Sequence, residues 1–375
     1  MTDPHARTTP PHYELHWPGK LPWQAATRVA SFRHTDAFDL PPPRAAQSPS
    51  LTPDTQLPAP SFRNRLVFGD NLAAMEALLP EFRGRVDLIY LDPPFDADQE
   101  FTLRAPLGEG AGMGESREEA VEAVAYRDVW GEGRNCYAQM FYERLPLLRE
   151  LLSDTGSLIV HVNWRVGHLV QLLLDEVFGA GERARTGAPG FRCEIVWGYG
   201  GGGAVKNVYR RKHDNLFWYS RSERWKFNPQ YRPYSDGTRQ RGLTAIKGDR
   251  YELRDEGASL ETWWTGPEVQ KILSPTAYEN LKFPTQKPEA LLERIIRGHS
   301  DEGDLVADFF CGSGTTGVVA ERLGRRWLLA DQGRHALLTT RKRLAALQLE
   351  LHAASLPCRA FDVFEISPSR GEEDV

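Results

Sequence analysis

Cysteine is scarce in this sequence of 375 residues, and the few cysteines follow no pattern. Cys136, Cys193, Cys311 and Cys358 share no metal-ligand spacing, so neither a disulfide scaffold nor a zinc site is indicated. We predict that the protein uses no metal. The sequence also lacks a long uncharged apolar run and an N-terminal signal-peptide core, so we expect no membrane association and a cytoplasmic location.

Positive charge is in deficit overall, because the sequence has 46 Lys and Arg but 51 Asp and Glu, which gives a net charge of −5. Residues 183–254 reverse this balance: they hold sixteen Lys and Arg against six Asp and Glu, or +10, which leaves −15 elsewhere. Aromatic residues are interleaved with these charges. A basic run is usually a solvated surface, but this asymmetry within an acidic chain favours a phosphate-contacting surface. The predicted contacts are Lys206, Arg210, Arg211 and Lys212.

Proline content and periodicity divide the chain into five parts. Residues 1–60 hold twelve of the 26 prolines and little periodicity, which predicts a partly disordered N-terminal arm. Strands and helices then alternate, and the uninterrupted strands predict an α/β fold with a mostly parallel, doubly wound sheet. The remaining predicted parts are a first half at 61–182, a basic region at 183–280, a second half at 281–350 and a tail at 351–375.

The predicted elements follow apolar periodicity. Residues 104–124 are rich in glycine and charge and are predicted to be a mobile loop. The predicted strands are residues 65–70, 86–92, 156–164, 304–310 and 325–331. The predicted helices are residues 71–79, 137–152, 166–179, 287–300 and 315–324, with a last helix from about residue 333.

One predicted strand ends in an unusual way, because residues 88–98 read LIYLDPPFDAD. Proline donates no backbone hydrogen bond and fixes φ, so Asp-Pro is common in the turn after a strand. A second interpretation is a stiff turn that holds a carboxylate and a carbonyl toward a ligand. The residues themselves leave both interpretations open.

Residues 304–331 form a complete βαβ nucleotide-binding unit, DLVADFFCGSGTTGVVAERLGRRWLLAD. Its glycines satisfy G-x-G-x-x-G, and Asp331 is placed to accept hydrogen bonds from both ribose hydroxyls. No Lys-Ser/Thr pair follows the glycines, which argues against a P-loop. Taken alone, this unit fits a nicotinamide-dependent dehydrogenase.

Asp308 does not fit a dinucleotide, because an acid at the strand end would repel a pyrophosphate. It would attract the ammonium of an amino-acid moiety. A cofactor with ribose, adenine and an amino acid but no phosphate is S-adenosylmethionine. Thr285, Lys287 and the helix that follows them are placed to hold the carboxylate of this cofactor.

Four segments together resemble the DNA amino-methyltransferases: GDN at 69–71, LDPPF at 91–95, PTQKPEALLERII at 284–296 and DFFCGSGTT at 308–316. Their order resembles the β class, and other phrases are similar to type III modification subunits and their solitary relatives. The resemblance implies the Rossmann-like class I methyltransferase fold, a circularly permuted motif order and a target-recognition region inserted at 183–280.

The resemblance also assigns roles to residues. Asp92 and the Pro93 carbonyl would accept the two N–H groups of the target amine, bonds that strengthen as positive charge develops on nitrogen. Pro94 stiffens the turn and Phe95 stacks on the base. Asp70 would bind the cofactor's adenine or cap a helix. The remaining implied cofactor contacts are Asp308, Phe309, Phe310, Cys311, Gly312, Gly314, Thr315 and Asp331.

The function implied is methyl transfer from S-adenosylmethionine to N6 of an adenine flipped out of double-stranded DNA. Cytosine N4 is the runner-up target, and a dehydrogenase or a non-catalytic DNA-binding module are alternatives from other classes. The implied partners are double-stranded DNA within the nucleoid, a second copy of the chain and a restriction endonuclease. His161 and His168 are expected to be packed or surface residues, and Trp263 and Trp264 are expected in the core.

Overall fold

One large sheet organises the computed structural model of the protein. Within the part that the structure describes, ten strands form this sheet in the order β1-β14-β2-β13-β12-β3-β6-β8-β7-β11. The described residues are 14–22, 30–39, 62–95, 99–106, 120–128, 134–201, 205–242, 253–266, 269 and 278–367.

The strands of the large sheet are β1 (Ser31–Phe38), β2 (Asn64–Phe68), β3 (Val86–Leu91), β6 (Leu152–Val162), β7 (Gly190–Gly198), β8 (His213–Ser220), β11 (Trp263–Trp264), β12 (Leu305–Asp308), β13 (Arg326–Asp331) and β14 (Phe361–Ser367). The helices are α1 (Asn71–Phe82), α2 (Arg134–Leu151), α3 (Gly167–Phe178), the 3-10 turn η2 (Gly181–Arg183), α4 (Asp236–Gly242), α5 (Glu289–His299), α6 (Thr315–Arg322) and α7 (Arg334–Ala353). No described helix is long and apolar enough to cross a bilayer.

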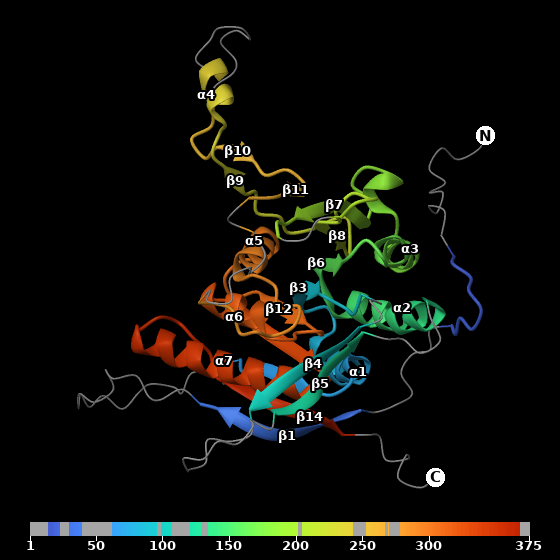
Figure 1. Ribbon diagram of the computed structural model, residues 1–375, viewed down its shortest axis with the longest axis vertical. Helices are drawn as coiled ribbons and strands as arrows, with labels where there is room; N and C mark the ends of the chain where they lie inside the picture. The colour runs from blue at the N-terminus through green and yellow to red at the C-terminus, as the bar shows by residue number, and fades with distance from the viewer. Residues whose placement is uncertain are drawn as a thin grey trace, which may run out of the picture.

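The centre of the sheet is parallel and covered on both faces. The six neighbouring strands from β14 to β6 run parallel, and β8 lies antiparallel between β6 and β7. Helices α1, α2 and α3 lie on one side of the sheet and α5, α6 and α7 on the other (Figure 1), each side with its own apolar cluster. The predicted α/β fold with a doubly wound sheet is confirmed.

Strand order reverses between β12 and β3. From β12 the chain continues to β13 on one side, whereas from β3 it continues to β6 on the other. The two strands pair in parallel, with Val306 opposite Leu88 and Ala307 opposite Ile89. Open α/β sheets bind ligands at such a reversal, outside the carboxyl ends of the strands. The Asp-Pro-Pro-Phe turn and the glycine turn therefore begin side by side.

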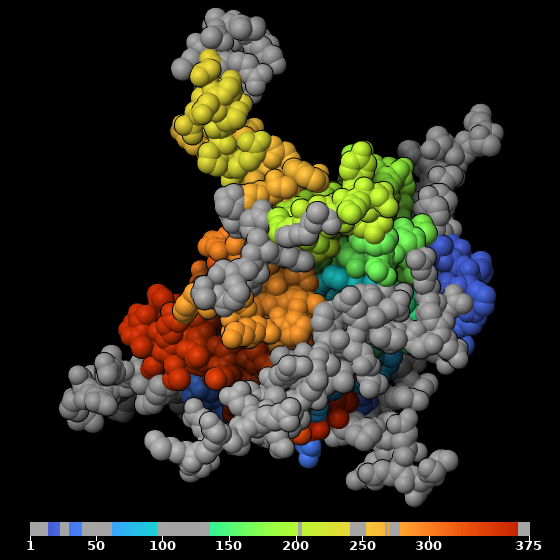
Figure 2. Space-filling model, viewed as in Figure 1, coloured from blue at the N-terminus to red at the C-terminus, as the bar shows by residue number. Residues whose placement is uncertain are grey.

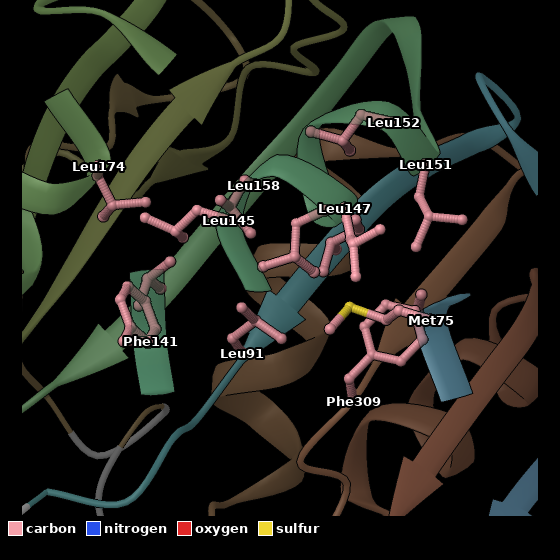
Figure 3. Close-up of a cluster of buried hydrophobic side chains, with 14 of the residues drawn as sticks. Met75, Leu91, Phe141, Leu145, Leu147, Leu151, Leu152, Leu158, Leu174 and Phe309 are labelled. Atoms are coloured by element: carbon pink, nitrogen blue, oxygen red, sulfur yellow. The ribbon is translucent and has the colours of Figure 1, made fainter. Parts of the chain in front are cut away.

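The core anchors both of these turns. Leu91 and Phe309, the residues next to Asp92 and Asp308, are each 1% exposed and belong to the same apolar cluster. Figure 3 shows them facing Met75 and a group of leucines from α2 and β6. Full burial of a side chain of this size stabilises the fold by roughly 1.5–3 kcal/mol. The turns therefore start from fixed positions.

The N-terminal arm, predicted to be partly disordered, and the tail both contribute structure to the body of the protein. Residues 14–22 dock on the body, where the Lys20 Nζ lies 2.6 Å from Glu176 Oε1 and over the rings of Trp17 and Tyr142. β1 pairs antiparallel with β14, and β14 extends the parallel sheet beside β2. The pairing of β1 with β14 joins positions more than 300 residues apart, so no local turn pattern in the sequence predicts it.

Among the described residues, two smaller sheets lie outside the main one. β4 (Gln99–Pro106) pairs with β5 (Ala120–Asp128), so the segment predicted as a loop at 104–124 begins and ends in strands, and residues 107–119 lie outside the described part. β9 (Tyr231–Arg232) pairs with β10 (Ala258–Ser259). Together with α4, this pair projects away from the body as a separate lobe (Figures 1 and 2).

Candidate active site

A cavity of about 690 Å³ opens at the carboxyl ends of β3, β12 and β13. This volume falls within the usual range for small-ligand sites. Most of the residues predicted from the sequence line it: Asp70, Asp92, Pro93, Pro94, Phe95, Thr285, Lys287, Asp308, Phe309, Phe310, Cys311, Gly312, Thr315 and Asp331. One cavity thus brings the Asp-Pro-Pro-Phe turn and the glycine turn together.

Gly314 is the exception, because it does not line the cavity. It caps the N-terminus of α6 with φ of 77°, in the left-handed region. A Cβ at this position would lie 2.6 Å from the Thr340 side chain. Gly314 therefore shapes the turn through its backbone. Its predicted contact with the cofactor stays a prediction.

Asp92 presents an unsatisfied oxygen. Its Oδ2 accepts a hydrogen bond from the Lys287 ammonium, but its Oδ1 is buried and has no partner among the described residues. A buried acceptor left without a donor costs roughly 1–3 kcal/mol. A ligand that brings an N–H to Oδ1 would recover that loss. The Phe95 ring lies beside the pair, with its centroid 5.2 Å from the Lys287 Nζ.

Lys287 lines the cavity, but its ammonium makes an ion pair that the sequence did not predict. The sequence analysis gives it to the cofactor's carboxylate, whereas the structure pairs it with Asp92. Thr285, its predicted companion, lines the cavity with φ of 63°. A β-branched residue rarely adopts positive φ, and such strain is concentrated at functional sites. The turn at 283–287 is therefore held in a strained shape against the cavity.

Asp308 is buried behind the glycine turn. Its Oδ1 accepts from the Phe310 amide at 3.0 Å and its Oδ2 from the Thr316 hydroxyl at 2.5 Å. Burial raises the pKa of Asp308 to about 7 against the opposing effect of these bonds, and the nearby Asp92 and Asp331 raise it further. A cation in the cavity would favour its ionised form.

Asp331 closes β13 and holds the glycine turn. Its Oδ2 accepts from the Gly312 amide at 2.9 Å and its Oδ1 from the Gly333 amide at 2.7 Å. Each oxygen keeps lone-pair capacity for a further donor such as a hydroxyl. Burial raises the pKa of Asp331. Gly312 itself has φ of 51°, and a Cβ there would project toward Phe283.

Asp70 is a helix cap in the structure. Its Oδ1 accepts from the Leu72 and Ala73 amides at 3.0 and 3.2 Å, so the N-cap interpretation is confirmed. Its Oδ2 lies 3.1 Å from a guanidinium nitrogen of Arg144. Asp70 also lines the cavity, so an adenine contact stays a prediction.

Sequence reasoning missed several lining residues, among them Arg144, Phe283 and Tyr90. Arg144 on α2 donates hydrogen bonds to Asp70 and Asn71, and burial lowers the pKa of its guanidinium. In the sequence, an arginine among the apolar residues of a helix could have indicated that it serves the site. Phe283 stacks on His335 with ring centroids 5.3 Å apart. Tyr90 lines the cavity from β3. A phenylalanine in a loop and a tyrosine in a strand carry no such signal.

The predicted phosphate contacts lie in residues 205–212, here called the basic loop. The loop joins β7 to β8, and because β8 is antiparallel to β6, it lies at the same edge of the sheet as the cavity. Lys206, Arg210 and Arg211 are exposed, and none of the four predicted cations pairs with an acid of the described chain. Arg211 instead lies over the exposed Trp164 ring, 3.8 Å from its centroid.

A second depression of about 360 Å³, here called the outer hollow, lies beside the basic loop. Trp263 is 59% exposed and lines it, so the prediction that Trp263 is a core residue is wrong, whereas Trp264 is buried as predicted. The two side chains alternate across the edge strand β11, which exposes one of them. The residues of the outer hollow are Gly198, Tyr199, Arg210, Lys212, His213, Trp263 and Thr265.

Six other cations of the basic region are neutralised within the protein. They sit in ion pairs with acids, many of them at the opposite edge of the sheet. The pairs are Arg183–Asp175, Arg185–Glu223, Arg192–Glu182, Arg224–Asp154, Lys226–Asp304 and Arg232–Glu261. These six cations are therefore less available to an outside partner than the four of the basic loop.

Comparison with known proteins settles the family. A family model described as DNA methylase, covering the N6 and N4 enzymes, matches residues 86–342. This chain belongs to that family. The match spans both the Asp-Pro-Pro-Phe turn and the glycine turn. The chain is therefore a DNA methylase of the N6/N4 family with S-adenosylmethionine as its methyl donor, and the dehydrogenase and non-catalytic alternatives are excluded.

Two known methyltransferases are similar to this chain over different lengths. The type II methyltransferase M.EcaI of Enterobacter cloacae is 26% identical over 339 residues, which cover 75% of this chain and 69% of that protein. The type II methyltransferase M2.DpnII of Streptococcus pneumoniae is 50% identical over 95 residues, 25% of this chain and 34% of that protein.

Solved structures also resemble this chain, at low sequence identity. The M1.HpyAVI–SAM complex is 19% identical with a TM-score of 0.45, and the match covers 75% of this chain and 98% of that one. The cytosine-N4-specific PvuII DNA methyltransferase is 19% identical with a TM-score of 0.46, over 75% of this chain and 86% of that one.

Proposed function

We propose that this DNA methylase transfers a methyl group to N6 of an adenine in double-stranded DNA at specific sites. The observation that carries the proposal is the buried Oδ1 of Asp92, an acceptor without a donor among the described residues, in the cavity that also holds the glycine turn. An exocyclic N–H is a donor that this oxygen lacks. A base stacked in a duplex cannot reach such a cavity, so the target must be flipped out.

The cavity fits the cofactor that the family uses. Asp92, Asp308 and Asp331 end three neighbouring strands and make the cavity attractive to a cation. We propose that Asp331 holds the ribose, Asp308 the ammonium, and the turn from Phe309 to Gly312 the adenosyl group. Thr285 and Thr315 line the side where a carboxylate would lie. When bound, S-adenosylmethionine supplies a methyl group on a positively charged sulfur.

The chain's own groups then act on the amine. Asp92 Oδ1 and the Pro93 carbonyl accept its two N–H groups, and both bonds strengthen as positive charge develops on nitrogen. Lys287 holds the other carboxylate oxygen and so fixes the direction of Oδ1. Phe95 stacks on the base and keeps the amine in line with the methyl group.

DNA is held at the same edge of the sheet in this proposal. Lys206, Arg210, Arg211 and Lys212 contact phosphates, and the region around the outer hollow reads the sequence beside the target. By analogy with the β class, we propose that the methylase works as a homodimer. Because its relatives are named type II methyltransferases, we also propose that it protects DNA from a companion restriction endonuclease.

Mass spectrometry of nucleosides tests the function. Unmethylated bacterial DNA is incubated with the purified chain and S-adenosylmethionine carrying a deuterated methyl group, then digested to nucleosides. We expect labelled N6-methyladenine, and none with an Asp92→Ala variant. Labelled N4-methylcytosine would correct the target base, and no labelled nucleoside at all would refute the proposed activity.

A further inference from the structure

Four polar side chains form a hydrogen-bonded row across the sheet beside the cavity. The Tyr90 hydroxyl lies 2.8 Å from His161 Nδ1, and His161 Nε2 lies 3.2 Å from Asp214 Oδ2. The Tyr199 hydroxyl donates to Asp214 Oδ1 at 3.0 Å. These residues come from β3, β6, β8 and the end of β7, which are neighbours in that order.

The row runs from the cavity to the outer hollow. Tyr90 lines the cavity and Tyr199 lines the outer hollow. Tyr90, His161 and Asp214 are 2%, 0% and 4% exposed, so the polar groups between the two ends are sealed from water. Buried polar groups are costly unless they are fully satisfied. His161 is packed in the interior, as predicted, but burial alone does not explain why it joins such a row.

The partners of His161 fix its proton. A carboxylate only accepts hydrogen bonds, so Asp214 requires the N–H on Nε2. Nδ1 is then the acceptor, and the Tyr90 hydroxyl must donate to it. Burial raises the pKa of Tyr90 well above its ordinary value, and Asp92, Asp308 and Asp214 raise it further, so the phenol keeps its hydrogen. That hydrogen is committed to His161, which leaves the lone pairs of the Tyr90 oxygen for other partners.

Tyr90 lies near both Asp92, proposed to bind the target amine, and Asp308, proposed to bind the cofactor. It lies two positions before Asp92, near the end of β3, and both residues line the cavity. The carboxylates of Asp92 and Asp308 both act electrostatically on its hydroxyl. In the proposed methyl transfer, positive charge would develop on the target nitrogen beside Asp92.

We propose that Tyr90 is a further catalytic residue, whose oxygen stabilises the positive charge that develops on the target amine, and that His161 and Asp214 are positioning residues. This inference rests on the proposed methyl transfer. His161 and Asp214 keep the Tyr90 hydrogen turned away from the amine. If that hydrogen pointed into the cavity, it would oppose the developing charge.

Single-turnover methyl transfer at saturating cofactor tests the row. Tyr90→Phe removes only the hydroxyl, and His161→Phe frees the hydroxyl to rotate. We expect each variant to slow transfer on the order of 10- to 100-fold, with cofactor affinity unchanged within about twofold. Because the residues act as one unit, we expect the double variant to be no slower than the slower single variant.

His299 supplies the matched control. It is 3% exposed, but its ring contacts Trp218 and Phe227, with centroids 4.4 and 5.8 Å away, and no described acid pairs with it. We expect His299→Phe to leave the rate of methyl transfer unchanged. An equal loss of rate in this control would show that removing any buried histidine has the same effect, and would overturn the positioning role.

Asp214→Asn separates positioning from packing. An amide of the same shape can donate to Nε2, which would move the His161 proton to Nδ1 and turn the Tyr90 hydrogen into the cavity. We expect nitrogen-15 NMR to show His161 protonated on Nε2 in the unmodified chain and on Nδ1 in this variant, with transfer at least as slow as in His161→Phe. The opposite tautomer in the unmodified chain would overturn the inference.

The two proposals fail in different ways. Normal transfer by Tyr90→Phe, or additive losses in the double variant, would overturn the role of Tyr90 and leave the proposed function intact. Absence of methyl transfer by the unmodified chain would overturn the proposed function and the role of Tyr90 together.

Discussion

Asp308 shows how a single buried carboxyl can make ligand binding depend on pH. Its pKa is raised to about 7, chiefly by burial. For the fold alone, a raised carboxyl pKa gives stability that is complete below the unfolded pKa near 4 and is lost as the pH rises through about 7. A cationic ligand has the opposite preference, since it favours the ionised form.

Cofactor affinity should therefore rise with pH if Asp308 binds the ammonium. Calorimetry with S-adenosylmethionine should give a dissociation constant about tenfold lower at pH 8 than at pH 6, the limit for a ligand that binds only the ionised group. Asp308→Asn should bind more weakly and with no dependence on pH in this window. An unchanged pH dependence in this variant would assign the effect to another group.

A substitution at Gly312 tests whether the glycine turn contacts the cofactor, because it changes the shape of the turn and no charge. Its φ of 51° strains any residue with a Cβ, and the added side chain would project toward Phe283, on the cavity wall. Gly312→Val should weaken S-adenosylmethionine binding at least tenfold by calorimetry. Gly187→Val is a matched control, because this glycine also has positive φ of 77° but open space around its Cβ position. Equal losses in both variants would remove Gly312 from the site.

The strands differ in how well the sequence predicts them. β3 and β12 are short, buried and apolar, and each ends in a distinctive turn, so both were predictable with the residues that follow them. β1 and β14 pair with each other from opposite ends of the chain. The projecting lobe of β9, α4 and β10 rests on strands of two residues each. Periodicity cannot be read from two residues.

The basic loop makes a prediction at the scale of an element. Each phosphate contact contributes about −0.9 to the slope of log affinity against log salt for duplex DNA. Arg210→Ala together with Arg211→Ala should flatten that slope by up to about two and weaken specific and non-specific DNA alike. Cofactor affinity should not change, since neither residue lines the cavity.

Two arginines of the same region provide the control. Arg185 and Arg224 pair with Glu223 and Asp154 at the opposite edge of the sheet. Their replacement by alanine removes the same charge but should leave the salt slope unchanged. If this control flattened the slope as much as the loop variant, net charge and not the basic loop would govern DNA binding.

Across the whole molecule, the sequence predicted the alternating fold and most of the cavity wall because these features are encoded locally. Asp92, Asp308 and Asp331 each stand at the end of an apolar strand, a pattern that can be read from the sequence alone. The Lys287–Asp92 pair and the row from Tyr90 to Tyr199 join residues far apart in the chain. Such contacts depend on the order and register of strands, which no local pattern specifies.

The central claim is that one cavity holds the cofactor and the target amine in adjacent subsites across the reversal between β12 and β3. Single-turnover methyl transfer to DNA, titrated with S-adenosylmethionine, tests it most directly with Asp92→Ala and Asp331→Ala. Asp92→Ala should lower the rate at saturating cofactor on the order of 10²–10³-fold or more, with cofactor affinity within several-fold of the unmodified chain. Asp331→Ala should raise the cofactor concentration needed for half-maximal rate and retain most of the saturating rate. Near-normal transfer by Asp92→Ala, or loss of the same parameter in both variants, would contradict the two adjacent subsites.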